Sequence, residues 1–179
     1  PNIIEIIWHD LGQHLNCYGW DNANSPNLNK MAEEGTMLTK MFCTAPQCSP
    51  SRSSIMTGCY PHSNGMMGLA HLGWEYNKGQ RTITQILKEN GYKTFLNGHQ
   101  HEADRKSEQY LKEKLGYDHI ISDTAEFFEN KAQQDEPFFL SIGFFDVHRP
   151  NEADVSQNDV ENAELPAYVP ENDGTKRDM

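Results

Sequence analysis

The chain has 179 residues, an apolar share of 36% and a formal net charge of −11. This length is enough for one domain with a sizeable hydrophobic core, and the composition indicates a globular rather than a disordered protein. Long-range repulsion argues against binding to nucleic acid or another polyanion, so an anionic ligand would need a locally basic pocket. The apolar runs are too short to span a bilayer, and we expect no membrane partner.

The start of the chain and its cysteines leave the cellular compartment open. Pro1 is not a methionine, so a signal sequence could precede it, and a periplasmic, secreted, lysosomal or cytoplasmic location is compatible with the sequence. The four cysteines, at positions 17, 43, 48 and 59, are unevenly spaced. This spacing does not indicate a disulfide framework.

The N-terminal part of the chain predicts a strand, a helix and a second strand. Residues 3–8 are a short β-branched apolar run followed at once by polar side chains, which is typical of a buried strand that ends in a loop. Ser25 precedes a proline at the first position of a predicted helix, and Gly35 closes that helix. Residues 36–42 alternate enough to predict a strand.

A second predicted helix begins next to a cysteine. Ser49 is expected to cap a helix that starts at Pro50 and ends near Gly58, so Cys48 lies just before its N-terminus. Unpaired backbone N–H groups, the helix dipole and the guanidinium of Arg52 favour negative charge there. This placement predicts an anion site, whereas a small buried thiol before a capped helix is the alternative interpretation of the cysteine taken alone.

The remaining segments repeat the order of helix and strand. Residues 82–90 have helical spacing and stop at a glycine, and residues 93–96 predict the next strand. Residues 124–134 predict an amphipathic helix, and residues 138–145 an apolar strand that leads into polar side chains. The alternation predicts an α/β domain with a largely parallel sheet flanked by helices, in which ligands bind beyond the carboxyl ends of the strands. The acidic segment 151–179 is expected to be a linker or a surface excursion.

The run CSPSRSSIMTG at residues 48–58 resembles the sulfatase signature, C-x-P-S-R followed by T-G. The resemblance implies an alkaline-phosphatase-like fold and a sulfuric ester or sulfamate hydrolase, of which residues 1–179 would be the N-terminal portion of a single catalytic domain. It also implies that a maturation enzyme converts Cys48 to formylglycine, whose hydrate attacks sulfur with one hydroxyl and expels sulfate with the other. Arg52 would hold that nucleophile, so both residues are predicted to be catalytic.

Two further blocks resemble the same family. The run GYKTFLNGHQH at residues 91–101 is similar to the family segment G-Y-x-T-x-x-x-G-K-x-H. His101 matches the family's histidine and is predicted to be catalytic, whereas His99 stands where the family usually has a lysine and is predicted to bind substrate. The block 138–150 resembles the family strand that ends in histidine and proline, and His148 is predicted to protonate the leaving oxygen or to bind sulfate.

The end of the first predicted strand resembles the metal-binding start of the family. Most sulfatases have two aspartates where this chain has His9 and Asp10. The resemblance implies a divalent metal, most often Ca²⁺, bound by Asp10, by the converted Cys48 and by a residue at the position of His9. Calcium prefers oxygen ligands, so a histidine ligand would favour Mn²⁺ or Zn²⁺. Alternatively, His9 would contact the metal ligands without binding the metal itself. The other family ligands lie in a distal half that has no counterpart here.

Within the family, residues 9–12, 48–58, 61–66 and 145–149 are most similar to the heparan N-sulfatase branch. That likeness implies a sulfated carbohydrate substrate and glycosaminoglycan degradation. The remaining predicted substrate-binding residues, which would line the sugar-sulfate pocket, are His14, His71 and Arg149.

Two other interpretations remain open. A phosphonate monoester hydrolase or phosphodiesterase of the same superfamily would share the nucleophile, and a catalytically silent fragment would lack half of the metal ligands. Because half of the expected metal ligands are missing, the isolated chain is expected to show little or no activity.

Overall fold

A four-stranded parallel sheet forms the centre of the first of two compact units in this computed structural model. The sheet unit comprises residues 1–9 and 42–147, and the second unit comprises residues 10–41 and 148–179. The strands follow the order β1 (Ile3–Trp8), β4 (Phe138–Phe144), β2 (Lys93–Gly98) and β3 (His119–Ile121), and each adjacent pair is parallel. The structure describes residues 1–21, 23–131, 135–148, 165, 169–172 and 174–175.

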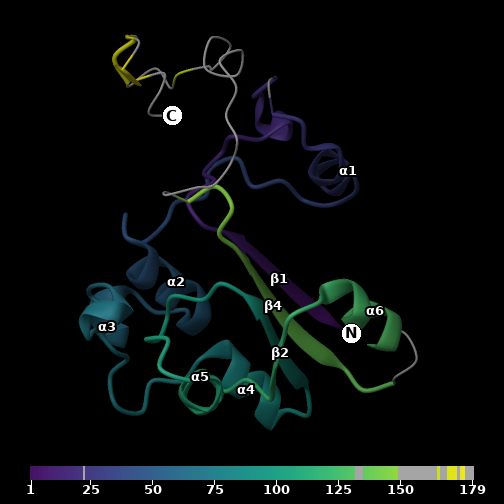
Figure 1. The fold of residues 1–179 in the computed structure, drawn as a ribbon, viewed down its shortest axis with the longest axis vertical. Helices are drawn as coiled ribbons and strands as arrows, with labels where there is room; N and C mark the ends of the chain where they lie inside the picture. The colour runs from purple at the N-terminus through teal and green to yellow at the C-terminus, as the bar shows by residue number, and fades with distance from the viewer. Residues whose placement is uncertain (22, 132–134, 149–164, 166–168, 173, 176–179) are drawn as a thin grey trace. The chain divides into compact units, whose positions relative to one another are not determined.

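Helices cover both faces of this sheet, as Figure 1 shows. The helices on one face are α2 (Cys48–Thr57), α4 (Ile83–Glu89) and α5 (Glu108–Leu115); α3 (Pro61–Asn64) packs against α2, and α6 (Thr124–Lys131) lies on the other face. A short 3₁₀ turn, η2 (Ala70–Leu72), follows α3. This arrangement confirms the predicted α/β fold. No helix of the described residues is long and apolar enough to cross a membrane.

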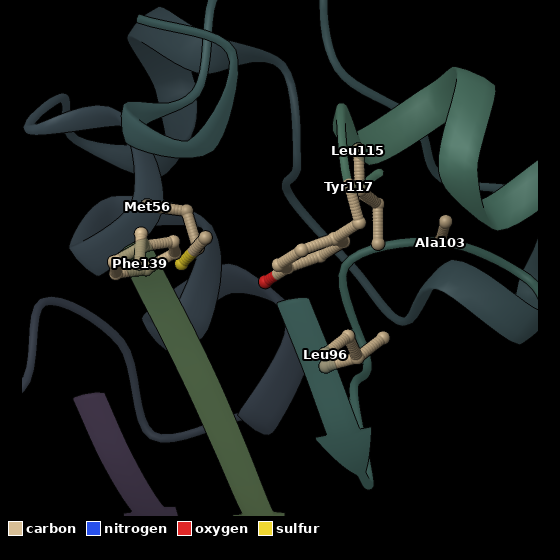
Figure 2. Close-up of a cluster of buried hydrophobic side chains, with 6 residues drawn as sticks. All are labelled: Met56, Leu96, Ala103, Leu115, Tyr117 and Phe139. Atoms are coloured by element: carbon tan, nitrogen blue, oxygen red, sulfur yellow. The ribbon is translucent and has the colours of Figure 1, made fainter. Parts of the chain in front are cut away.

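The side chains of the strands alternate between two hydrophobic clusters, because successive residues of a strand point to opposite faces. The first cluster, shown in Figure 2, comprises Met56, Leu96, Ala103, Leu115, Tyr117 and Phe139. The second cluster comprises Phe95, Phe127, Phe138, Leu140 and Ile142. Met56 belongs to α2, so its burial against Leu96 of β2 and Phe139 of β4 holds that helix on the sheet.

The second unit contains η1 (Asn16–Tyr18) and α1 (Pro26–Glu34). Asn29 Nδ2 donates a hydrogen bond to Asn16 Oδ1 at 2.7 Å, which links the two elements. Gly35 ends α1 as predicted, and Ser25 stands at its N-cap. The Ser25 hydroxyl makes no capping bond to the helix backbone; it accepts a hydrogen bond from the Asn16 backbone N–H at 3.2 Å instead.

The strand predicted over residues 36–42 is wrong. The structure describes all of these residues, and none of them belongs to a strand. Their apolar side chains are exposed, up to 83% at Phe42. An alternating pattern specifies a strand only where one face is buried against a partner, and the described chain provides no partner strand here.

The predicted start of the helix after Cys48 is also wrong. Helix α2 begins at Cys48 and has Gln47 at its N-cap, so the cysteine is the first residue of the helix. Ser49 lies inside the helix, where it is fully buried and its hydroxyl accepts a hydrogen bond from the Ala70 backbone N–H at 3.1 Å. A tertiary partner, which the local sequence does not reveal, therefore replaces the expected capping bond.

A carboxylate lies on the face of β1 that points toward the first hydrophobic cluster. Glu5 shares this face with Ile3, which packs against the first cluster. Ser141 of the paired strand β4 donates a hydrogen bond to Glu5 Oε2 at 2.9 Å. Burial raises the pKa of Glu5, and the Glu102 carboxylate acts in the same direction, whereas Ser141 and Arg52 oppose the shift. The ionised form of this side chain therefore destabilises the folded chain.

Replacing Glu5 by glutamine is expected to stabilise the protein at neutral pH. The Glu5 carboxyl binds its proton more tightly when folded, so its stabilising contribution is complete below the unfolded pKa of 4.5 and is lost as pH rises through the raised folded pKa. We expect Glu5→Gln to increase the free energy of unfolding by about 1 kcal/mol at pH 7 and by much less near pH 4. Urea unfolding at both pH values measures this. Glu129→Gln, at an exposed position of α6, is the control and should change neither value; a destabilised Glu5→Gln protein at pH 7 would contradict the prediction.

Candidate active site

Aromatic side chains follow three neighbouring strands and pack together at the carboxyl edge of the sheet. His9 follows β1, His99 follows β2 and Phe145 follows β4. The ring centroids are 4.2 Å apart for His9 and His99, 4.7 Å for His99 and Phe145, and 5.5 Å for His9 and Phe145. Ligands of parallel α/β sheets bind beyond the carboxyl ends of the strands, so this edge is the expected place for a site.

Two glycines allow the strand ends to approach this closely. A Cβ atom at Gly98, whose φ is +73°, would lie 2.3 Å from the carbonyl oxygen of Gly143. A Cβ atom at Gly143 would lie 1.7 Å from the carbonyl oxygen of His99. The backbone N–H of His99 donates to the Gly143 carbonyl at 2.8 Å. Any side chain at either glycine would push the strand ends apart, because the obstructing atoms belong to the backbone.

Cys48 contacts one of two paired histidines. Its Sγ lies 3.0 Å from His101 Nδ1, and His101 Nε2 lies 2.8 Å from His71 Nδ1. Each contact needs one donor and one acceptor, so the position of the proton on His101 is linked to both neighbours. Burial, followed by the nearby His71, lowers the pKa of His101. The His101 ring is therefore a neutral acceptor or donor beside the sulfur at physiological pH.

A buried ion pair connects α2 to the loop that follows β2. Arg52 Nε donates to Glu102 Oε1 at 2.8 Å, and both residues are only 4% exposed. Arg52 Nη2 also donates to the His99 carbonyl at 3.2 Å, while Glu102 Oε2 accepts from the His101 backbone N–H at 3.0 Å. The remaining guanidinium nitrogen, Nη1, is buried and has no hydrogen-bond partner among the described residues. The pair thus fixes Cys48 and His101 relative to each other.

Arg105, in the same loop, donates a hydrogen bond to His99 Nδ1. Burial, together with the nearby charges of His9 and Arg105, lowers the pKa of His99 to about 3. The imidazole that stands at the family's lysine position is therefore neutral at physiological pH. It does not supply the positive charge that a lysine would.

Three of the other residues predicted from the sequence belong to the second unit. Asp10 and His148 belong to the second unit and pair with each other, with 3.5 Å between Asp10 Oδ2 and His148 Nε2. His14 is in the same unit, where its Nδ1 lies 3.0 Å from the Leu11 carbonyl oxygen. Arg149 is outside the described residues. The functional roles assigned to these residues stay predictions.

One group of possible metal ligands lies wholly within the first unit. His9, Cys48 and His101 each offer one ligand atom, and these atoms lie within 4.8 Å of one another. Two imidazole nitrogens and a sulfur suit a borderline metal such as Zn²⁺, whereas Ca²⁺ prefers oxygen ligands. Asp10, the carboxylate predicted to bind the metal, is in the second unit. The donor set described in the first unit therefore does not match calcium, and the metal stays a prediction.

Sequence reasoning missed Glu102 and Arg105. Glu102 could have been found from its neighbours, because an arginine buried in a helix needs a counter-charge and an acidic residue directly follows His101. Arg105 carries no comparable signal. Its contact with His99 depends on a turn of the loop that no local pattern specifies.

Comparisons with known proteins assign the chain to a family. Residues 1–168 match the sulfatase family. Human arylsulfatase D is 38% identical over 112 residues, which are 58% of this chain and 19% of that protein. The N-acetylglucosamine-6-O-sulfatase of Bacteroides thetaiotaomicron is 31% identical over 120 residues, which are 66% of this chain and 20% of that protein. The chain belongs to the sulfatase family, whose members hydrolyse sulfate esters.

The fold also agrees with that of solved sulfatase-like structures. The crystal structure of Ps i-CgsB in complex with k-i-k-neocarrahexaose superposes with a TM-score of 0.69 at 23% identity, and the match covers 90% of this chain and 48% of that one. At this identity the likeness shows the fold alone, which a putative sulfatase from Bacteroides fragilis shares with a TM-score of 0.69 at 22% identity. The chain spans about a fifth to a third of the length of the curated relatives it matches.

Neutralising Glu102 is expected to be far more damaging than neutralising a surface carboxylate. Glu102→Gln keeps the shape of the side chain but removes the carboxylate that pairs directly with the buried Arg52 charge, which should reduce the free energy of unfolding by about 3 kcal/mol. The matched control is Glu89→Gln, which breaks the exposed pair with Arg81 and should cost less than about 1 kcal/mol. Urea unfolding of both variants compares the two costs. Equal values would show that the buried pair does not hold the site together.

Proposed function

We propose that the whole protein hydrolyses the sulfate group of a sulfated sugar, using a formylglycine derived from Cys48. The observation that carries this proposal is the contact of the Cys48 sulfur with His101 Nδ1, at 3.0 Å, at the start of a helix on which Arg52 lies one turn further on. A surface thiol has no need of a neutral histidine and an immobilised arginine beside it. A nucleophile that exchanges protons needs a proton acceptor beside it, and Arg52 fixes the position of that acceptor through Glu102.

The environment of position 48 suits a reacting anionic group. Cys48 begins the ten-residue helix α2, whose N-terminal N–H groups and dipole favour negative charge. Its Sγ stands in for the oxygen atoms of formylglycine, a hydrated aldehyde that supplies one hydroxyl for attack on sulfur and a second for release of sulfate. His101 Nδ1 is within reach to take a proton from this position and return it. Arg52 keeps its helix and the His101 loop in register through Glu102.

A sugar substrate is supported by the proteins that this chain resembles. One relative is an N-acetylglucosamine-6-O-sulfatase, and one structural neighbour was solved with a neocarrahexaose. Among sugars, the similarity of residues 9–12, 48–58 and 61–66 to heparan N-sulfatases favours an N-sulfated glucosamine. His148 is proposed to protonate the leaving group. A divalent metal is proposed to bind beside position 48 and to stabilise negative charge on the sulfate.

Cys48 should be modified and required for activity. Production together with a formylglycine-generating enzyme is expected to lower the mass of the peptide containing Cys48 by about 18 Da, because the thiol becomes an aldehyde. Sulfate release should appear in proportion to the converted fraction and should be lost in Cys48→Ala. Cys43→Ser, which alters an exposed cysteine, is the control and should stay active. Undiminished activity of Cys48→Ala would refute the assigned nucleophile.

The substrate class can be tested on the converted full-length protein. We expect its kcat/KM for an N-sulfated or O-sulfated glucosamine to exceed that for a phosphodiester by about tenfold or more, which corresponds to roughly 1.4 kcal/mol of differential transition-state binding. Sulfate and phosphate release in parallel assays give the ratio. A preference of that size for the phosphodiester would instead identify a phosphonate monoester hydrolase or phosphodiesterase.

A further inference from the structure

The sequence predicts that Arg52 and His99 contact the sulfate group, but the charge of Arg52 is compensated and His99 is uncharged. The guanidinium of Arg52 is paired with Glu102 at 2.8 Å, and Glu5 adds a second carboxylate to its surroundings. His99 Nδ1 receives its hydrogen bond from Arg105. A guanidinium has only donors, so this nitrogen carries no proton and the His99 ring is neutral. Neither residue offers a net charge to a sulfate group.

Arg105 is different, because its charge has no carboxylate against it. It is an exposed residue, and it takes part in no ion pair within the described part of the chain. The side chain that it contacts, His99, is a neutral acceptor and leaves the guanidinium charge intact. An arginine is always protonated, so this charge persists at every pH at which the protein is folded.

The position of Arg105 is suited to a small anionic group. Together with Gly98, His99, Gly143 and Phe145 it lines an open pocket of about 420 Å³ at the carboxyl ends of β2 and β4. The pocket adjoins the catalytic group, because the ring centroids of His99 and His101 are 5.4 Å apart.

We propose that Arg105 binds the sulfate group of the substrate and supplies the charge that His99 does not. The identity of the anion rests on the proposed function, whereas the anion site itself rests on the pocket and on a guanidinium that forms no ion pair among the described residues. One N–H of Arg105 is engaged by His99, which holds the side chain over the pocket and leaves its other donors available. A planar guanidinium can present two of these donors to two oxygens of one tetrahedral anion.

Titration with inorganic sulfate tests the site without any turnover. Calorimetry on the full-length protein at low, constant ionic strength is expected to give a dissociation constant that rises about tenfold or more in Arg105→Gln. Arg105→Lys, which keeps the charge but loses the two-donor geometry, should lie between the two. The matched control is Lys106→Gln, which removes the same charge from the next residue, whose ammonium lies over the Tyr110 ring 4.9 Å away. It should bind sulfate as the unaltered protein does.

Kinetics of the converted protein provide the second measurement. We expect Arg105→Gln to raise KM for a sulfated sugar about tenfold with kcat nearly unchanged, because the charge contacts the sulfate in the ground state and in the transition state alike. Unchanged sulfate affinity in Arg105→Gln, or no measurable sulfate binding by the unaltered protein, would overturn the inference. Activity with unchanged KM in Arg105→Gln would also overturn it and leave the proposed function standing. Arg105-dependent sulfate binding without turnover of sulfated sugars would support the anion site and count against the proposed function.

Discussion

The ion pair between Arg52 and Glu102 is the contact on which the geometry of the candidate site depends. It joins a helix that packs on the sheet to a loop that leaves the end of β2, and these two segments contribute Cys48 and His101. Because both partners are 4% exposed, little water can replace either of them if the pair opens. Glu102 is also held in place, since its second carboxylate oxygen accepts a hydrogen bond from the His101 backbone N–H. The ion pair thus keeps the Cys48 sulfur and the His101 imidazole within hydrogen-bond distance, although neither side chain takes part in it.

The same pair shapes the electrostatics of the carboxyl edge. A buried arginine next to an anionic substrate would normally be the first candidate for binding it, but here its charge is matched by Glu102 and by the nearby Glu5. Burial, assisted by neighbouring histidines, lowers the pKa of His99 and His101 and keeps both rings neutral. Arg105 retains its full charge at the exposed rim, where the cost of desolvation is small. Arg52 therefore stabilises the arrangement of the site, its catalytic role stays a prediction, and the anion is proposed to be recognised by Arg105, which lies outside the sequence motifs.

Local patterns predicted several elements correctly. The apolar runs at β1 and β4, and the helix from Thr82 with its capping box, lie where the sequence indicated. The pattern failed at residues 36–42, where alternation occurs without a partner strand, and at Ser49, whose hydroxyl is used by Ala70 rather than by its own helix. In both cases a distant segment decided the outcome. A local rule has no access to that information.

The sequence by itself determined the family and the parallel α/β fold, because each is encoded in contiguous residues: the run at 48–58 and the regular alternation of strands and helices. The same run predicts Cys48 as the nucleophile. The tertiary structure alone decided which charges are available at the site. Glu102 neutralises Arg52, and Arg105 reaches His99, only because parallel strand ends and the loop after β2 bring them together. Charge compensation depends on distance in space and on burial. Neither can be obtained from the order of residues along the chain.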